Sequence, residues 1–118
     1  PEYLVLVRQR EFFEDLPLIT GVRPPVVDSL DILKNPAHML RQLCVALDVP
    51  WCEGAMTQWK VGSRPTDGVW ASHWYEAVES STQFSLPPSS SPELDEADLA
   101  LVADMMGHYE AMARFKLT

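Results

Sequence analysis

The chain has 118 residues, of which 47% are hydrophobic, so it is long enough for one small core and short for two. Its formal net charge of −8 argues against a nucleic-acid or anionic-membrane surface, because such a surface needs clustered Lys and Arg. No run reaches the ~20 apolar residues of a membrane span, and no basic stretch precedes an apolar one as in a signal peptide.

The cysteines point to a reducing compartment rather than to a metal site. Cys44 and Cys52 lack the C-x-x-C spacing and the histidine partners of a zinc finger. Two reduced thiols in the cytoplasm are therefore the expectation. Nothing else in the sequence demands a metal.

The first element, within residues 1–18, is predicted as a helix, with a strand as the alternative. Residues 3–7 are rich in strand formers. The charged run that follows them favours a helix, because it completes an apolar stripe at helical spacing: Leu4, Val7, Phe12 and Leu16. Arg8 and Arg10 are expected on a solvated face, paired with nearby carboxylates.

A short strand is predicted next. The proline pair at 24–25 excludes a helix, and Val26-Val27 predicts one short strand near residues 25–28. Asp28 or Asp31 is expected to bond backbone groups in a polar connection to the following helix. No second apolar run is long enough to build a parallel sheet with this strand, so the chain is expected to be mostly α.

Asn35-Pro36 predicts the start of a helix. The asparagine side chain can accept a hydrogen bond from the unpaired first amides, and the first helical position does not need the N–H group that proline lacks. The helix should end near Asp48, which can adopt the left-handed conformation expected at that exit. Its predicted buried face consists of Pro36, Met39, Leu40, Leu43 or Cys44, and Leu47. In that stripe, Cys44 is expected to be a small core residue rather than a nucleophile.

The segment from Arg64 to Gly68 predicts a tight turn able to receive an anion. Pro65 fixes one backbone φ, and Gly68 permits a positive φ, so the remaining amide groups can face outward. Arg64 is the only cation in this turn. On general exposure rates, however, an arginine is more often a solvated or paired surface residue than a ligand contact.

A helix is expected to follow the turn from about Val69, capped by Thr66 or Asp67. The predicted core anchors lie four residues apart on one face of this helix: Trp70, Trp74 and Val78. His73 sits beside that stripe, where a partly exposed histidine bonded to backbone or water is a simpler interpretation than a catalytic base.

The chain closes with a linker and a long helix. Residues 87–92 consist of prolines and serines, and residues 93–116 have acidic side chains at the start and basic ones at the end, which suits the helix dipole. Ser90 or Ser91 is expected to cap the helix, with Pro92 in its first turn. The apolar arc is so wide that it must pack against another body, and His108 within it is expected to be a satisfied core or boundary histidine.

The run R-P-T-D-G-V-W-A-S-H-W-Y resembles the late glycine-rich segment of sulfotransferases, α/β proteins with the P-loop nucleotide-binding fold. In that family R-K-G-x-x-G-D-W-x-x-H-F grips the 3′-phosphate of the sulfuryl donor PAPS. Arg64 matches the arginine, Gly68 the second glycine, Trp70 the tryptophan and His73 the histidine, while Pro65 stands in place of lysine. P-P-V-V-D-S and the N-P helix start are similar to divergent, bacterial-type members, and the resemblance covers about residues 10 to 115.

The resemblance implies that residues 1–118 are one partial domain, the C-terminal helical portion of a P-loop sulfotransferase-like fold. In this interpretation residues 1–86 carry the glycine-containing turn at 62–68, residues 87–92 are the linker, and residues 93–116 are the C-terminal helix. The chain lacks a G-x-x-x-x-G-K-[ST] motif, so the P-loop and catalytic base are expected upstream.

The resemblance also implies a PAPS-binding site in this chain, with no catalytic residue and no metal ligand among its members. The residues expected to bind PAPS are Arg64, Asp67, Gly68, Trp70 and His73. The expected partners are the nucleotide donor and a small-molecule acceptor, with no nucleic acid and no membrane. The isolated chain is expected to be inactive and to self-associate through exposed apolar helix faces. The alternative function is a non-catalytic, acidic helical module that binds a partner protein through its Trp and Met faces.

Overall fold

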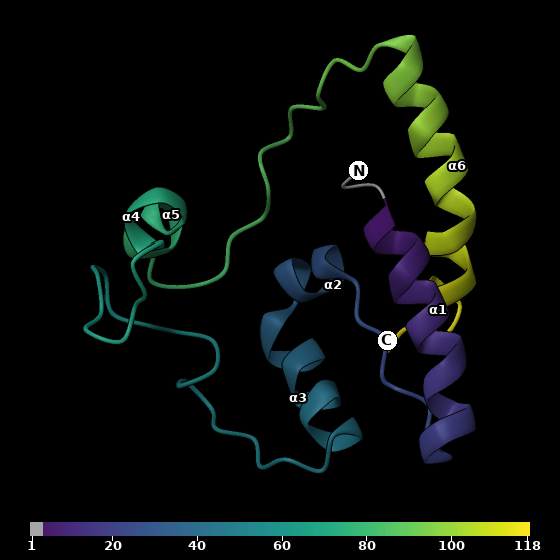
Figure 1. Cartoon of the computed structure of the whole chain (residues 1–118). Helices are drawn as coiled ribbons and strands as arrows, with labels where there is room; N and C mark the ends of the chain where they lie inside the picture. Colours follow the sequence, from purple (N-terminus) through teal and green to yellow (C-terminus); the bar gives the residue numbers. More distant parts are fainter. Residues whose placement is uncertain (1–3) are drawn as a thin grey trace. The chain divides into compact units, whose positions relative to one another are not determined.

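The computed structural model describes residues 4–118, and helices dominate it (Figure 1). The elements are α1 (Leu4–Thr20), α2 (Ser29–Lys34), α3 (Pro36–Ala46), α4 (Ala71–Trp74), α5 (Glu76–Glu79) and α6 (Glu96–Ala113). They belong to two compact units. One unit holds Pro88–Thr118 with the described residues before Ser29, and the other holds Ser29–Pro87. The mostly helical fold class predicted from the sequence is confirmed.

Helix α1 confirms the choice of helix over strand for the first element, although Tyr3 in that element lies outside the described residues. The expected charge pairs form along its exposed side. Arg8 Nη1 lies 2.6 Å from Glu11 Oε2, and Arg10 Nε lies 2.8 Å from Glu14 Oε1. Each such pair stabilises a helix by only about 0.2 to 0.5 kcal/mol, so α1 depends mainly on packing.

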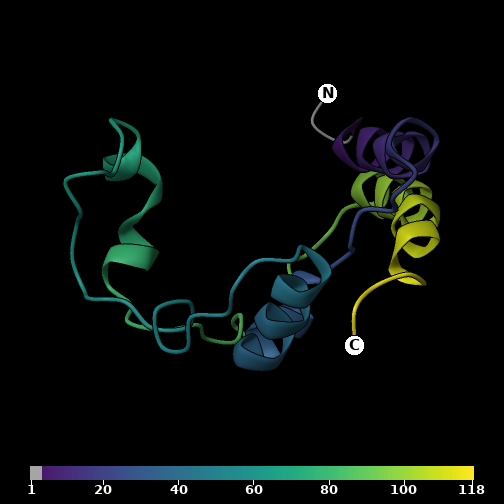
Figure 2. The same ribbon diagram turned by 90° about the horizontal axis from the view of Figure 1, so that it is seen from below.

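The core of the first unit lies between α1 and α6, which run side by side in both views (Figures 1 and 2). Phe13 of α1 is only 6% exposed, and its ring centroid lies 5.5 Å from that of Phe115. The guanidinium carbon of Arg23 lies 4.2 Å from the Phe115 centroid and 5.2 Å from the Phe13 centroid. This aromatic and cationic cluster joins the middle of α1 to the residues that follow α6.

The strand predicted near residues 25–28 is reduced to a single bridge. Val26 pairs in parallel with Lys116, and the amide of Leu117 donates to the carbonyl oxygen of Val26 at 2.9 Å. Nearby, the carboxylate of Asp28 accepts a hydrogen bond from the hydroxyl of Tyr109. Residues 4–118 contain no strand longer than an isolated bridge. The segment after α1 is therefore held by α6 and by the residues that follow α6, and not by a sheet.

Helix α6 begins later than predicted, because a different residue caps it. Asp95 is the N-cap, and its Oδ1 accepts the amide of Asp98 at 2.8 Å. The prediction of a cap at Ser90 or Ser91, with Pro92 in the first turn, is therefore wrong. A carboxylate satisfies a free amide as well as serine does and adds a negative charge at the positive end of the helix dipole.

The broad apolar stripe of α6 is only partly covered by α1. Met105 is buried, while Leu101 in the same stripe is exposed. His108 is half-buried, and its Nδ1 is buried without a hydrogen-bond partner among the described residues. The expectation of a satisfied histidine is therefore not met at this nitrogen.

Helices α2 and α3 begin the second unit, and the predicted helix start is confirmed. Pro36 opens α3, and the side chain of Asn35 accepts the amide of His38 at 3.4 Å. At the other end, Asp48 takes the predicted left-handed conformation, with a φ of 53°. Local sequence therefore determines both ends of α3.

The buried face of α3 is narrower than predicted. Met39 and Cys44 are buried, and the thiol of Cys44 lies 3.7 Å from the sulfur of Met56 in the following segment. This confirms Cys44 as a core residue. Leu47, in contrast, is 52% exposed, because it is the C-cap residue and lies beyond the last turn of the buried face.

Candidate functional site

The predicted anion-binding turn is braced by two hydrogen bonds of its own. The amide of Arg64 donates to Asp67 Oδ2 at 2.8 Å, and the amide of Asp67 donates back to the carbonyl oxygen of Arg64 at 3.0 Å. Gly62, with a φ of 100°, bends the chain into the turn. Gly68 does not have a positive φ, so the prediction that it supplies one is wrong. The reciprocal bonds between Arg64 and Asp67 close the turn before Gly68 is reached.

Arg64 is half-buried, and its guanidinium makes no hydrogen bond or ion pair with any residue that the structure describes. The other arginines, all within residues 4–118, have carboxylate, carbonyl or aromatic partners: Arg8, Arg10, Arg23, Arg41 and Arg114. Guanidinium carries five donors in a planar fork. A half-buried guanidinium with all of them unused can bind an anion without first breaking an ion pair.

The backbone amides of the turn differ in their availability to a ligand. The amide of Asp67 is engaged with Arg64, whereas the amide of Gly68 makes no hydrogen bond within the described part of the chain. The Asp67 carboxylate is also engaged, because it accepts the amide of Arg64. The unused donors of the turn, among the described residues, are therefore the Arg64 guanidinium, the Gly68 amide, and the amide and hydroxyl of Thr66.

The tryptophans after the turn are exposed, so the prediction of core anchors is wrong. The exposed fraction is 67% for Trp70 and 75% for Trp74, and Val78 is exposed as well. Helix α4 is only one turn long and is separated from α5 at Tyr75, as Figure 2 shows for the two short helical segments. A stripe at four-residue spacing needs a continuous helix, and this break removes it.

The predicted cap of this helix is also wrong. Helix α4 begins at Ala71 with Trp70 as its N-cap, and no side chain caps it. Neither Thr66 nor Asp67 serves as the cap, because the carboxylate of Asp67 is already bonded inside the turn. A short helix without a cap or a buried face has little intrinsic stability.

Trp70 and His73 form an exposed ring pair beside the turn. Their ring centroids lie 6.2 Å apart, and both side chains are exposed. The partly exposed histidine predicted at position 73 is confirmed as exposed. Within residues 4–118 no hydrogen bond or ring contact joins either ring to Arg64. The predicted site residues thus fall into a braced turn and a neighbouring ring pair.

The two ends of this loop are joined by contacts that sequence reasoning missed. Trp59 is half-buried and donates its Nε1–H to Ser81 Oγ at 3.1 Å. The amide of Gly62 donates to the carbonyl oxygen of Glu79 at 2.7 Å. The available signal was the pair of aromatic residues that flank the loop, Trp59 and Phe84, whose rings meet edge to face at 5.2 Å.

Across residues 4–118, no three or more His, Cys, Asp and Glu side chains gather as they would around a metal ion. None of the helices in that range combines the length and the apolar character needed to cross a membrane. Cys44 and Cys52 are both free thiols.

Residues 11–115 match the family described as the sulfotransferase domain. Two curated plant proteins from Arabidopsis thaliana are similar to parts of the chain. Branched-chain-amino-acid aminotransferase-like protein 1 is 38% identical over 95 residues, which cover 75% of this chain and 17% of that protein. For protein 2 of that name, identity is 39% over 67 residues, covering 57% of this chain and 12% of that protein.

The chain thus spans less than a fifth of the length of these relatives. No solved structure gives a significant match to it. The family match extends over nearly all of the described residues, and it includes the braced turn, the ring pair, α6 and the part of α1 from residue 11 onward. The chain therefore belongs to the sulfotransferase domain family.

Proposed function

We propose that residues 62–73 form the 3′-phosphate side of a site for the sulfuryl donor PAPS. The supporting observation is the half-buried Arg64, whose guanidinium has no partner among the described residues. A phosphate monoester presents charged oxygens in the spacing that a planar guanidinium binds through two N–H groups. Sulfotransferases use a nucleotide donor, so PAPS is the ligand that we assign to this turn.

Each residue of the site has a separate role in this proposal. Arg64 binds two phosphate oxygens, and the unused amide of Gly68 adds a third donor. Asp67 keeps the turn closed, and its own amide would have to release the Arg64 carbonyl to reach the phosphate. Trp70 and His73 border the nucleotide. These groups orient the donor and screen its charge, which is positioning rather than bond making.

The reaction assigned to the whole protein is sulfuryl transfer from PAPS to a hydroxyl or amine of a small-molecule acceptor. PAPS supplies the sulfuryl group, and none of the residues of this chain is proposed as its catalytic base. The plant relatives are named as aminotransferase-like proteins, but the matched segment is 17% or less of their length. Aminotransfer is therefore not part of the proposal. The free thiols favour a cytoplasmic location.

Calorimetric titration with adenosine 3′,5′-bisphosphate tests this function, because the compound carries the 3′-phosphate without the reactive sulfate. The 118-residue chain and the full-length gene product should both be titrated, at low salt where a charge effect is largest. Saturable binding with one site per chain is expected in the full-length protein. If neither form binds the bisphosphate, the proposed donor site is refuted.

A second function, a protein-binding module, is favoured by the exposed aromatic side chains. Trp70, the N-cap of α4, and Trp74, its last residue, are largely exposed, and so is the neighbouring Val69. Contiguous apolar patches on soluble proteins usually mark interaction sites, and Trp and Met are enriched in protein interfaces. This module would be acidic and non-catalytic. It would give no bisphosphate binding in the titration above, so one measurement separates the two functions.

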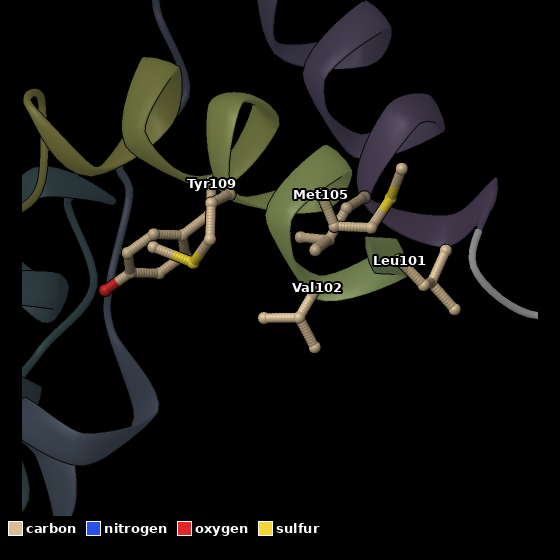
Figure 3. A pocket seen from close by; sticks show the side chains of 6 residues that line it. Leu101, Val102, Met105 and Tyr109 are labelled. Carbon is tan, nitrogen blue, oxygen red and sulfur yellow. The ribbon is translucent and has the colours of Figure 1, made fainter. Parts of the chain in front are cut away.

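We also propose that the isolated chain self-associates through the outer side of α6. Leu99, Val102 and Met106 are exposed at helical spacing, and an open apolar hollow of about 350 Å³ lies between Val102 and Tyr109 (Figure 3). Sedimentation velocity should show an average mass that rises with concentration. Val102→Glu should reduce this rise, whereas Val45→Glu, at an equally apolar exposed position of α3, should not. A sharp, concentration-independent thermal transition of a monomer would contradict this proposal.

A further inference from the structure

We propose that Trp59, Ser81 and Phe84 act together as a clasp that holds the Arg64 turn in its anion-binding shape. This inference deepens the proposed donor site and rests on it. Trp59 precedes the turn and the other two residues follow α5, so the clasp joins the two ends of the loop that contains every proposed site residue. Its members are positioning residues, because none of them belongs to the turn itself.

Three kinds of contact build the clasp. The backbone amide of Trp59 donates to the carbonyl oxygen of Thr82 at 2.9 Å, within a short antiparallel contact in which Gln58 and Gln83 pair. The indole Nε1–H of Trp59 donates to Ser81 Oγ at 3.1 Å. The indole also meets the ring of Phe84 edge to face, with centroids 5.2 Å apart. Backbone, polar and aromatic contacts therefore converge on Trp59.

Ser81 links the clasp to the end of α5. Its hydroxyl accepts the indole N–H of Trp59 and donates to the carbonyl oxygen of Val78 at 2.9 Å. One hydroxyl thus satisfies a donor from one side of the loop and a carbonyl from the other. Ser81 is half-buried, so the loss of this hydroxyl would leave the indole N–H of Trp59 without its partner, whereas the carbonyl oxygen of Val78 would still accept the Ser81 amide at 3.2 Å.

Within the described residues, hydrogen bonds attach the loop to the rest of the chain only near its two ends. In the part of the chain that the structure describes, every hydrogen bond made by residues 63–78 stays within residues 63–81. The bonds that reach across are those of the clasp and the 2.7 Å bond from the Gly62 amide to the Glu79 carbonyl oxygen. The shape of the loop therefore depends on how firmly its two ends are held together.

Holding the ends lowers the entropic cost of binding a phosphate. A loop of this length with free ends samples many conformations. A ligand that binds only one of them has its affinity reduced by the fraction of time that the loop spends in that conformation. When the two ends of the loop are held together, the bend at Gly62 has a fixed position, and the turn begins two residues later, at Arg64. The clasp thus pre-orders the turn before a ligand arrives, which is the general way in which preorganisation raises affinity.

The test compares amide hydrogen exchange and bisphosphate affinity in four variants of the full-length protein. Ser81→Ala removes the bridging hydroxyl, and Trp59→Phe keeps an aromatic ring against Phe84 but removes the indole N–H. Ser81→Thr retains the hydroxyl and should restore wild-type behaviour. Ser80→Ala is the matched control, since the hydroxyl of Ser80 bonds only to carbonyl oxygens within its own helical turn.

We expect Ser81→Ala and Trp59→Phe to speed amide exchange at Gly62 about 3- to 10-fold, the effect of one lost hydrogen bond. Both variants should weaken adenosine 3′,5′-bisphosphate binding by a similar factor, while the Ser80→Ala control should leave both the exchange rate and the affinity unchanged. Unchanged exchange overturns the clasp, and faster exchange with unchanged affinity overturns its positioning role. Failure of the wild type to bind refutes the donor site instead, and this result is distinguishable because the exchange measurement needs no ligand.

Discussion

Replacing Arg64 with alanine is expected to weaken the binding of adenosine 3′,5′-bisphosphate by about 1.5 to 3 kcal/mol, or roughly 10- to 150-fold. This is the usual range for a hydrogen bond to a charged group. The side chain has no ion pair among the described residues, so no intramolecular partner is left unpaired by the substitution. Folding should therefore change little, and isothermal titration calorimetry at low salt measures the effect directly.

Three comparisons make the Arg64→Ala result specific. Arg64→Lys should be partly defective, because an ammonium keeps the charge but loses the planar fork. Arg10→Ala removes the same charge where the arginine is already paired, 2.8 Å from Glu14, and should leave affinity unchanged. Trp70→Ala should cost under about 1 kcal/mol of stability, since the side chain is 67% exposed. Equal affinity in wild type and Arg64→Ala would leave the turn with a purely structural role.

Sequence reasoning succeeded where the deciding contacts lie within a few residues. The start of α3 is set by Asn35, whose side chain accepts an amide three residues later, and its exit by the left-handed Asp48. Helix α1 was likewise predictable, because its charged pairs lie three and four residues apart. Such interactions are readable from spacing alone, since the helix repeat fixes which side chains meet.

It failed where one side chain had two local partners to choose from. Asp67 was expected to cap a helix, but its carboxylate bonds the amide of Arg64, and the turn closes on itself. At the start of α6, two kinds of residue could cap the helix, and Asp95 does so in place of the predicted serine. The energies of such alternatives differ by about 1 kcal/mol or less, which residue preference alone cannot rank.

Burial and long-range pairing were the least predictable features of the site. Four-residue spacing predicted a buried face at Trp70 and Trp74, yet a face is buried only if another element covers it, and here none does so within the described residues. The bond between Trp59 and Ser81 joins residues 22 positions apart in the chain, so no local pattern announces it. The turn was thus predictable from its own residues, whereas the contacts that hold it were not.

The largest effect on stability is expected from Phe13→Ala, at about 3 to 5 kcal/mol, the usual cost of truncating a buried phenylalanine. Phe13 is 6% exposed and contacts both Phe115 and the guanidinium of Arg23, so its removal opens a cavity where α1 meets the residues after α6. Small units have little stability to lose. The first unit should therefore unfold at moderate temperature or low denaturant, which circular dichroism can follow.

The control is Phe12→Ala, because it replaces the same type of side chain at the neighbouring position of the same helix. Phe12 is 63% exposed, so Phe12→Ala alters helix propensity as Phe13→Ala does but leaves no cavity. Its effect should stay within about 0.5 kcal/mol, the usual range for an exposed position. The difference between the two variants isolates the packing of α1 against α6. If both phenylalanines cost the same, α1 is not held by this aromatic cluster, and the first unit must owe its stability to contacts elsewhere.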